Sequence, residues 1–428
     1  MSRRAQQGAK RVAVEFPVRR GEAAQLLSLW PALPAVFYAP PHAPRWVALG
    51  AAAELRLPAL HPRRVRAWAD AQFTALDARQ AEGFAPRVLG GAGFSAASVG
   101  RAPWKGFPGF LFLWPRWTYI EDGQRTRLIF IGESRELSAA AAEQTQIAAA
   151  LARPVTPNPT LNSQHAVSAA RFGRLVTAAR AEVRRGRVEK LVVARATRLT
   201  ASSPWSAAAT LRALLRAPGC TAFAVRLDRK TFLGATPERL VLRRGDRVWS
   251  EALAGTAAPG EATALRRSAK DLDEHQLVVS ELVERLRPLC LELRAPAKPS
   301  SRTLNDVVHL LTPLSGRLRE DTDLLEVVHR LHPTPAVGGR PQRKAQRWIV
   351  AREPRPRGWY TGWVGWLDRA GDGEMSVAIR CGLLRGRDAW IFAGAGIVAA
   401  SDPLAEYRET AAKFRPMLRA LGIAELPQ

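Results

Sequence analysis

The sequence has few cysteines that could form disulfides or bind zinc. Its 428 residues include only three cysteines, Cys220, Cys290 and Cys381, which lie far apart and lack the close spacing of a zinc site. An odd number of scattered cysteines is typical of proteins from a reducing compartment. We therefore expect a protein without disulfides or zinc.

Long apolar runs are also missing. No run reaches the roughly 18 to 20 residues that a membrane-spanning helix needs. The first 15 residues are basic and contain no apolar segment of the kind found in secretory signals. Because the hydrophobic content of 47% is ordinary for a globular chain, the sequence predicts a cytoplasmic protein with no membrane partner.

Lysine is scarce although the chain is strongly basic. Only eight of the 64 basic residues are lysines, and the formal net charge is +26. The arginines are spread throughout, with short pairs such as Arg184-Arg185 but no long tract. This spread indicates a bias of the whole composition and leaves a nucleic-acid-associated protein as a remote alternative. An anionic small substrate fits the charge equally well, so no nucleic-acid partner is expected.

Helical and strand patterns recur irregularly along the chain. Residues 188–199 are apolar on both faces, which predicts a central strand. Residues 222–228 and 231–242 predict two strands around a turn, and residues 262–293 predict mostly helix. Helices separated by pairs of strands are typical of an α+β protein rather than a doubly wound sheet.

Three segments are expected along the chain. Residues 1–10 predict a flexible basic tail, residues 11–160 an N-terminal part with few recognisable motifs, and residues 161–428 a C-terminal part in which the helix and strand pattern is clearer. The proline-rich run near residue 155 predicts a connection, because proline fits neither a helix interior nor a central strand.

The stretch 391–413 carries the strongest local signal. It begins as an apolar strand with two glycines, crosses a turn, and starts a helix with Asp402 at the N-cap and Pro403 at the first position. The two glycines are Gly394 and Gly396. On the helix, Glu406, Glu409 and Lys413 share one face. Such a face suits a divalent metal and an anionic ligand; the alternative is an ordinary solvated Glu–Lys helix.

Two further residues have patterns that suit acid–base chemistry. Lys190 shares a strand face with apolar residues, and burial would lower the pKa of its ammonium. The alternative is a lysine at a strand end that reaches water. Glu238 follows a tight turn and shares a face with Leu240, so its carboxyl could stay protonated as a general acid. For Glu238 the alternative is an ion pair with Arg239.

A second acidic pair begins another helix. Asp271 and Glu274 share one face there, and together with Glu406 and Glu409 they would provide the oxygen ligands that Mg²⁺ prefers. His275 and His309 could be ligands, but structural histidines explain both as well.

These segments, taken in order, resemble the chorismate-utilising enzymes, which include anthranilate, aminodeoxychorismate, salicylate and isochorismate synthases. The matching runs lie at 190–195, 234–238, 252–256, 270–275, 309–316, 332–339, 376–380 and 391–413. Before residue 160 the resemblance is faint and rests on Gly90, Gly91 and Phe94. It implies one large domain in which two large β-sheets face each other, with helices outside, and a chorismate-binding catalytic part at 161–428.

Two positions in the matching runs indicate the subfamily. Relatives that add water keep a lysine where this chain has Lys190, whereas those that add ammonia do not. Isochorismate synthases resemble this chain in having alanine at Ala336, where salicylate synthases tend to have threonine. The resemblance therefore implies an isochorismate synthase, an isomerase, with salicylate synthase as the alternative. It implies a role in menaquinone or siderophore biosynthesis, and we expect a monomer or weak dimer.

The resemblance also implies roles for individual residues. Mg²⁺ would be held by Glu274 and Glu409, with Asp271 and Glu406 bound through water, and would grip the ring carboxylate of chorismate. Asp271 departs from the glutamate that relatives often have. Lys190 would activate the water that attacks ring C2, and Glu238 would protonate the departing C4 hydroxyl. The implied substrate-binding residues are Ala254, Gly255, Thr256, His309, Ala336, Arg380, Gly394, Gly396 and Lys413.

Overall fold

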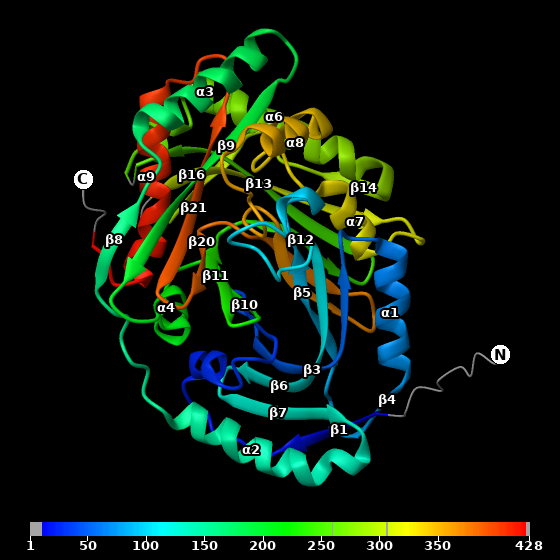
Figure 1. Cartoon of the computed structure of the whole chain (residues 1–428). Coiled ribbons are helices and arrows are strands. Elements are labelled where there is room, and N and C mark those ends of the chain that lie inside the picture. Colours follow the sequence, from blue (N-terminus) through cyan, green and yellow to red (C-terminus); the bar gives the residue numbers. More distant parts are fainter. Residues whose placement is uncertain (1–10, 259, 305–306, 425–428) are drawn as a thin grey trace, which may run out of the picture.

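Two long antiparallel strands organise the fold (Figure 1), β3 (Arg45–Leu57) and β6 (Phe110–Asp122). Their pairing is interrupted by a bulge between Ala51 and Ala53 of β3, next to Pro115 of β6. A bulge bends and twists a strand, and proline cannot donate a ladder hydrogen bond. The two ends of this strand pair consequently belong to different sheets.

The computed structural model describes residues 11–258, 260–304 and 307–424, so the predicted tail at 1–10 lies outside the described residues.

The first sheet continues from the C-terminal half of β6 and the N-terminal half of β3. On the β6 side lie β7 (Arg125–Gly132), β1 (Arg11–Phe16) and β4 (Leu76–Gln80). On the β3 side lie, in spatial order, β2 (Ala35–Ala39), β10 (Thr221–Leu227), β11 (Lys230–Thr236), β20 (Cys381–Arg385), β21 (Asp388–Ile397) and β9 (Lys190–Ala201), with β8 (Leu161–His165) and β17 (Gly339–Arg340) sharing the far edge of β9.

The second sheet continues from the other half of β6. In spatial order its strands are β5 (Arg87–Ala92), β18 (Trp363–Asp368), β19 (Gly373–Val377), β12 (Arg239–Arg244), β13 (Arg247–Ala257) and β16 (Val308–Leu318), with β14 (Cys290–Arg294) and β15 (Ser300–Thr303) on the far edge of β16. Both sheets contain strands from before and after residue 160, so the chain forms one domain. The predicted α+β fold with two large sheets is confirmed.

An aromatic core fills the space between the sheets. Trp104, from the loop after β5, is fully buried. Its ring contacts Phe232 of the first sheet at 5.3 Å and Phe392 of the same sheet at 5.6 Å between centroids. Phe107, three residues on, contacts Trp359 just before β18 at 5.6 Å. This loop therefore fastens the N-terminal part of the chain between the two sheets.

Helices cover the outer faces, as Figure 1 shows. Apolar residues of α2 (Leu137–Ala152), α4 (Ala207–Leu214) and α9 (Pro403–Ala420) pack on the first sheet. At the end of that sheet α3 (Ala169–Arg184) and α8 (Gln342–Arg352) pack on β9 and β21. The second sheet is covered by α1 (Pro62–Thr74), α6 (Ala269–Leu286) and α7 (Leu324–Leu331), with the short α5 (Ala262–Leu265) preceding α6.

Two predicted elements differ from the structure. The strand expected at 231–242 is divided into β11 and β12, because Pro237 interrupts the ladder and the chain passes there from the first sheet to the second. The segment 262–293, expected to be mostly helix, is helical up to Leu289, but its last residues form β14, which pairs with β16. In both cases pairing with a distant strand outweighs the local pattern.

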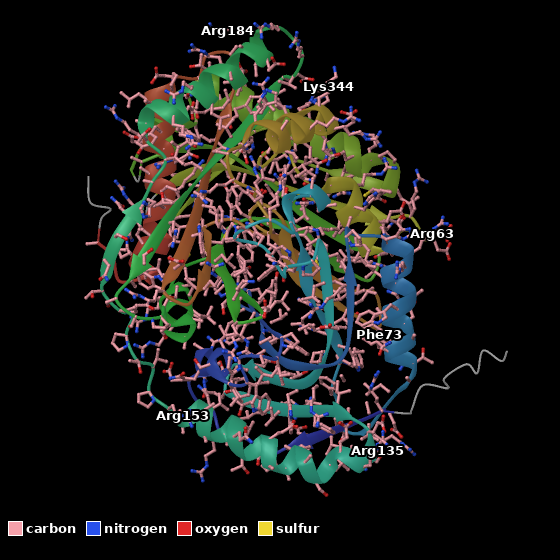
Figure 2. All side chains as sticks on the ribbon, in the orientation of Figure 1. Arg63, Phe73, Arg135, Arg153, Arg184 and Lys344 are labelled. Carbon is pink, nitrogen blue, oxygen red and sulfur yellow. The ribbon has the colours of Figure 1, made fainter. Side chains whose placement is uncertain are left out.

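The basic side chains are dispersed over the molecule. Figure 2 labels several that lie at well-separated places on its periphery, namely Arg63, Arg135, Arg153, Arg184 and Lys344. The dispersed arginines of the sequence therefore remain dispersed in the fold. In the part of the chain that the structure describes, no helix is long and apolar enough to cross a membrane.

We predict that Trp104→Ala lowers the free energy of unfolding by about 3–5 kcal/mol, because it removes a fully buried indole from between the two sheets. Urea denaturation measures this change. Leu291→Ala serves as the control, since Leu291 is 53% exposed and its loss should cost less than about 0.5 kcal/mol. A loss below about 1 kcal/mol for Trp104→Ala would show that the indole does not join the sheets.

Candidate active site

One cavity of about 200 Å³ brings together every residue predicted for the site. It lies where the ends of β9 and β21 meet β13 and where α6 and α9 approach them. Among the residues that line it are Lys190, Glu238, Ala254, Gly255, Thr256, Asp271, Glu274, His309, Ala336, Arg380, Gly394, Gly396, Glu406, Glu409 and Lys413. Residues up to 223 positions apart in the sequence, from Lys190 to Lys413, thus share one concave surface.

Two of these residues lie at passages between the sheets. Glu238 follows β11 of the first sheet and precedes β12 of the second, and Arg380 lies between β19 of the second and β20 of the first. The two passages are hydrogen-bonded, since the Val377 amide donates to the Glu238 carbonyl at 3.0 Å. Arg380 has a positive φ of 51°, a strained value for a residue with a side chain. Both side chains line the cavity from these passages.

Glu238 is a buried carboxyl, only 4% exposed. Burial, with a further contribution from the charge of Glu251, raises its pKa to about 8. Arg239, the alternative ion-pair partner, is instead paired with Glu374 at 3.0 Å and with Glu251 at 3.5 Å. The carboxyl therefore holds a proton at neutral pH, as a general acid must.

Lys190 forms a buried ion pair with Glu274. Its ammonium lies 2.8 Å from Glu274 Oε1, and its side chain is 1% exposed, so it does not reach water. Burial acts to raise the pKa of Glu274, but the charges of Lys190 and Lys413 outweigh it and lower that pKa. Gly396 makes the contact possible, because a Cβ there would lie 2.5 Å from Glu274 Oε1 and 2.9 Å from Lys190 Cε.

The two acids of α9 have lysine partners as well. Glu409 is 2.5 Å from Lys413 Nζ, which also donates to the Gly394 carbonyl at 3.0 Å. Glu406 is 3.6 Å from Lys270 Nζ. Burial and the neighbouring Glu409 raise the pKa of Glu406 to about 7, while Lys270 opposes the shift. Each of these acids is thus balanced by a separate lysine.

These carboxylates suit a divalent cation, and three of them are paired with lysines in this structure. Among the described residues, no three His, Cys, Asp or Glu side chains form a ready-made metal cluster. Mg²⁺ is usually bound by one or two carboxylates, water and substrate oxygens, and so does not need such a cluster. Glu274 and Glu409 line the cavity with acidic oxygens from different helices. Asp271 instead accepts a hydrogen bond from the Ser268 hydroxyl at 2.5 Å.

The part of the cavity wall that carries Arg380 and His309 suits an anion. His309 Nδ1 donates to the Gly255 carbonyl at 3.0 Å, so Nε2 is free to accept a hydrogen bond from Arg380 at 3.2 Å. Burial, with the charges of Arg380 and Lys413, lowers the pKa of His309 to about 3. The neutral imidazole therefore orients the Arg380 guanidinium without adding charge. Thr256 Oγ1 lies 3.1 Å from the same Nδ1.

Several lining residues were missed from the sequence. Tyr360 stacks on Phe392 with ring centroids 5.3 Å apart, and Thr361 and Val337 lie beside it on the cavity wall. The aromatic- and glycine-rich run 358–363 was the available signal. Lys270 stood within a matching run but was assigned no role. His275, by contrast, is structural and hydrogen-bonds Thr312 at 2.8 Å.

A family model described as chorismate binding enzyme matches residues 16–422. This chain belongs to the family of chorismate-binding enzymes. The match extends over the N-terminal part, where the sequence motifs were faint, and covers both sheets.

Isochorismate synthases are prominent among the relatives of this chorismate-binding enzyme. The chain is 39% identical over 258 residues to isochorismate synthase MenF of Bacillus subtilis, covering 58% of this chain but 55% of that relative. It is 36% identical over 366 residues to the salicylate biosynthesis isochorismate synthase of Pseudomonas aeruginosa, covering 80% and 76%. Its structure resembles that of MenF, the menaquinone-specific isochorismate synthase from Escherichia coli, with a TM-score of 0.79 and 28% identity, covering 97% and 94%. The predicted resemblance is confirmed.

The pKa of Glu238 predicts a pH-dependent difference in stability. In the unfolded chain the carboxyl ionises near pH 4.5, whereas in the folded chain it keeps its proton up to about pH 8. Its contribution to folding stability is therefore fully present below pH 4.5 and is lost as the pH rises to about 8, by at most about 1.4 kcal/mol per pH unit. Glu238→Gln cannot titrate, so it should gain stability relative to wild type across this range.

Urea denaturation in EDTA at several pH values within this range measures the difference. Glu292→Gln, at a residue whose side chain is 58% exposed, is the control and should follow the wild type. Parallel stability curves for wild type and Glu238→Gln would mean that Glu238 is ionised in the folded protein.

Proposed function

We propose that this chorismate-binding enzyme is an isochorismate synthase, which converts chorismate to isochorismate by adding water at ring C2 and removing the C4 hydroxyl. The observation that supports this best is that a buried lysine and a buried carboxyl with a raised pKa line the same cavity. Lys190 provides a base and Glu238 an acid, as the displacement requires. The names of its relatives support the same reaction.

Substrate binding follows from the charges on the cavity wall. Arg380, held by His309, and Lys413 would bind the enolpyruvyl carboxylate of chorismate, assisted by the backbone at Gly394 and Gly396. The segment 254–256 lies on the wall that carries His309 and would contact the ring. The overall positive charge also favours the approach of a dianionic substrate.

Acid and base act on the bound ring. Glu238 donates its proton to the departing C4 hydroxyl, and the high pKa that burial gives this carboxyl keeps the proton available. Lys190 accepts a proton from the water that attacks C2, for which it must be neutral. Mg²⁺ would be held by Glu274 and Glu409, with Asp271 and Glu406 bound through water, and would fix the ring carboxylate. Binding of Glu274 to the metal would also weaken its ion pair with Lys190.

Salicylate synthase is the second candidate. It would form isochorismate and then eliminate pyruvate at the same site. Ala336 lines the cavity, and alanine at this position is the pattern of isochorismate synthases, which favours release of isochorismate.

We propose that the enzyme acts in the cytoplasm as a monomer or weak dimer.

One assay tests reaction and metal together. With chorismate and Mg²⁺ the protein should form isochorismate, with little salicylate and no anthranilate, and EDTA should abolish turnover until Mg²⁺ is restored. Glu274→Ala or Glu409→Ala should reduce the rate by ~10²-fold or more, since metal stabilisation of the transition state is worth several kcal/mol.

Glu284→Ala is a matched control, because Glu284 lies on α6 like Glu274 but has a 70% exposed side chain. It should retain the wild-type rate. Full turnover in EDTA would exclude the metal, and salicylate or anthranilate as the main product would exclude isochorismate synthase.

A further inference from the structure

The turn that carries Ala336 forms one wall of the cavity. It connects α7 to β17, and both Ala336 and Val337 line the cavity. Its backbone is joined to the strand of Lys190, because the Val192 amide donates to the Gly338 carbonyl at 2.8 Å. The position of this turn therefore determines how Ala336 lies relative to Lys190.

A buried arginine–glutamate pair lies behind this turn. Arg357 and Glu353 have side chains only 2% and 4% exposed. The guanidinium donates to both carboxylate oxygens, from Nε at 2.9 Å and from NH2 at 2.6 Å. Glu353 also accepts a hydrogen bond from the Ala194 amide at 2.9 Å. Burying such a pair costs desolvation energy that often exceeds the gain in stability, which calls for another explanation.

The remaining guanidinium hydrogens join three separate parts of the cavity wall. Arg357 NH1 donates to the Val337 carbonyl at 2.6 Å and to the Thr361 hydroxyl at 3.3 Å. Its NH2 donates to the Val192 carbonyl at 2.8 Å. All three acceptor residues line the cavity. A planar guanidinium can satisfy these directions together, whereas a lysine ammonium cannot.

The other end of the turn is held in the same way from α6. Arg285, paired with Glu281, donates to the Leu331 carbonyl at 2.9 Å and to the Pro333 carbonyl at 3.2 Å. The turn is thus fixed between the helix that carries Glu274 and the buried pair of Arg357.

We infer that Arg357, oriented by Glu353, is a positioning residue for the reaction, which sets the Ala336 turn against the Lys190 strand and so determines rate and product choice. This inference rests on the proposed function. Arg357 itself does not line the cavity and is not a catalytic residue.

Arg357→Lys tests the inference, because it keeps the charge opposite Glu353 but loses the directed contacts with Val192 and Val337. Arg226→Lys is the matched control. Arg226 is also 2% exposed and donates to the carbonyls of Leu27, Leu29, Trp30 and Leu33, but neither it nor these residues line the cavity. Two readouts are compared: hydrogen exchange of the Val192 and Val337 amides, and the ratio of salicylate to isochorismate formed per chorismate consumed.

Arg357→Lys should accelerate exchange at these amides, reduce kcat by on the order of 10²-fold and change the product ratio by about fivefold or more. Arg226→Lys should lose stability but leave exchange at these amides and the product ratio unchanged. The product ratio does not depend on the fraction of folded enzyme, so a purely structural role would not alter it.

Wild-type exchange and wild-type product ratio in Arg357→Lys would overturn the inference. Failure of the proposed function has a separate signature, because the wild type would then form no isochorismate. The exchange comparison would still decide whether Arg357 holds the turn.

Discussion

The contact between Lys190 and Glu274 is the constraint on which the site depends. A charged lysine that is only 1% exposed needs an opposite charge beside it, because the cost of removing an ammonium from water is several kcal/mol. To meet this requirement, α6 must bring Glu274 to the start of β9, and position 396 must be glycine. The same principle is repeated at Glu406 with Lys270 and at Glu409 with Lys413. Three of the eight lysines in an arginine-rich chain are thus paired with acids of one cavity.

The two sheets serve this arrangement in different ways. The first sheet supplies Lys190 and the glycine strand β21, and the second supplies the His309 wall through β13 and β16. The passages between the sheets place Glu238 and Arg380 at their junction. Among the residues that the structure describes, those that line the cavity all lie at position 190 or later, and the described N-terminal part contributes packing, through Trp104 in particular.

The sequence was most informative about the charged residues of the site, because their residue types suit acid–base chemistry and metal binding. The matching runs and their order in the sequence point to Lys190, Glu238, the acids of α6 and α9 and the cation Arg380. The roles assigned to them stay predictions. The α+β class and the division into two large sheets were also predicted correctly, the latter through the resemblance.

What the sequence did not reveal depends on long-range contacts. The passage at Pro237 could not be distinguished from a continuous strand, since β11 and β12 owe their separation to pairing with β20 and β19. The apolar pattern around Lys190 suggested hydrocarbon neighbours, but its ion-pair partner Glu274 comes from helix α6, about 80 residues away in the sequence. Arg357 was hidden among 56 arginines, and only its contacts distinguish it. The aromatic- and glycine-rich run around Tyr360 was visible in the sequence, but only the fold places this residue on the cavity wall.

The proposed mechanism depends most on Lys190 as the group that accepts a proton from water. A guanidinium cannot release its proton at neutral pH, so Lys190→Arg keeps the charge and removes the base. The decisive measurement is kcat for isochorismate formation together with the affinity for chorismate, with the exposed Lys298→Arg as control. The mechanism predicts that Lys190→Arg loses about 10²- to 10⁴-fold in kcat with chorismate affinity close to wild type, while Lys298→Arg is unchanged. Turnover by Lys190→Arg near the wild-type rate would contradict it and reduce Lys190 to a charge partner of Glu274.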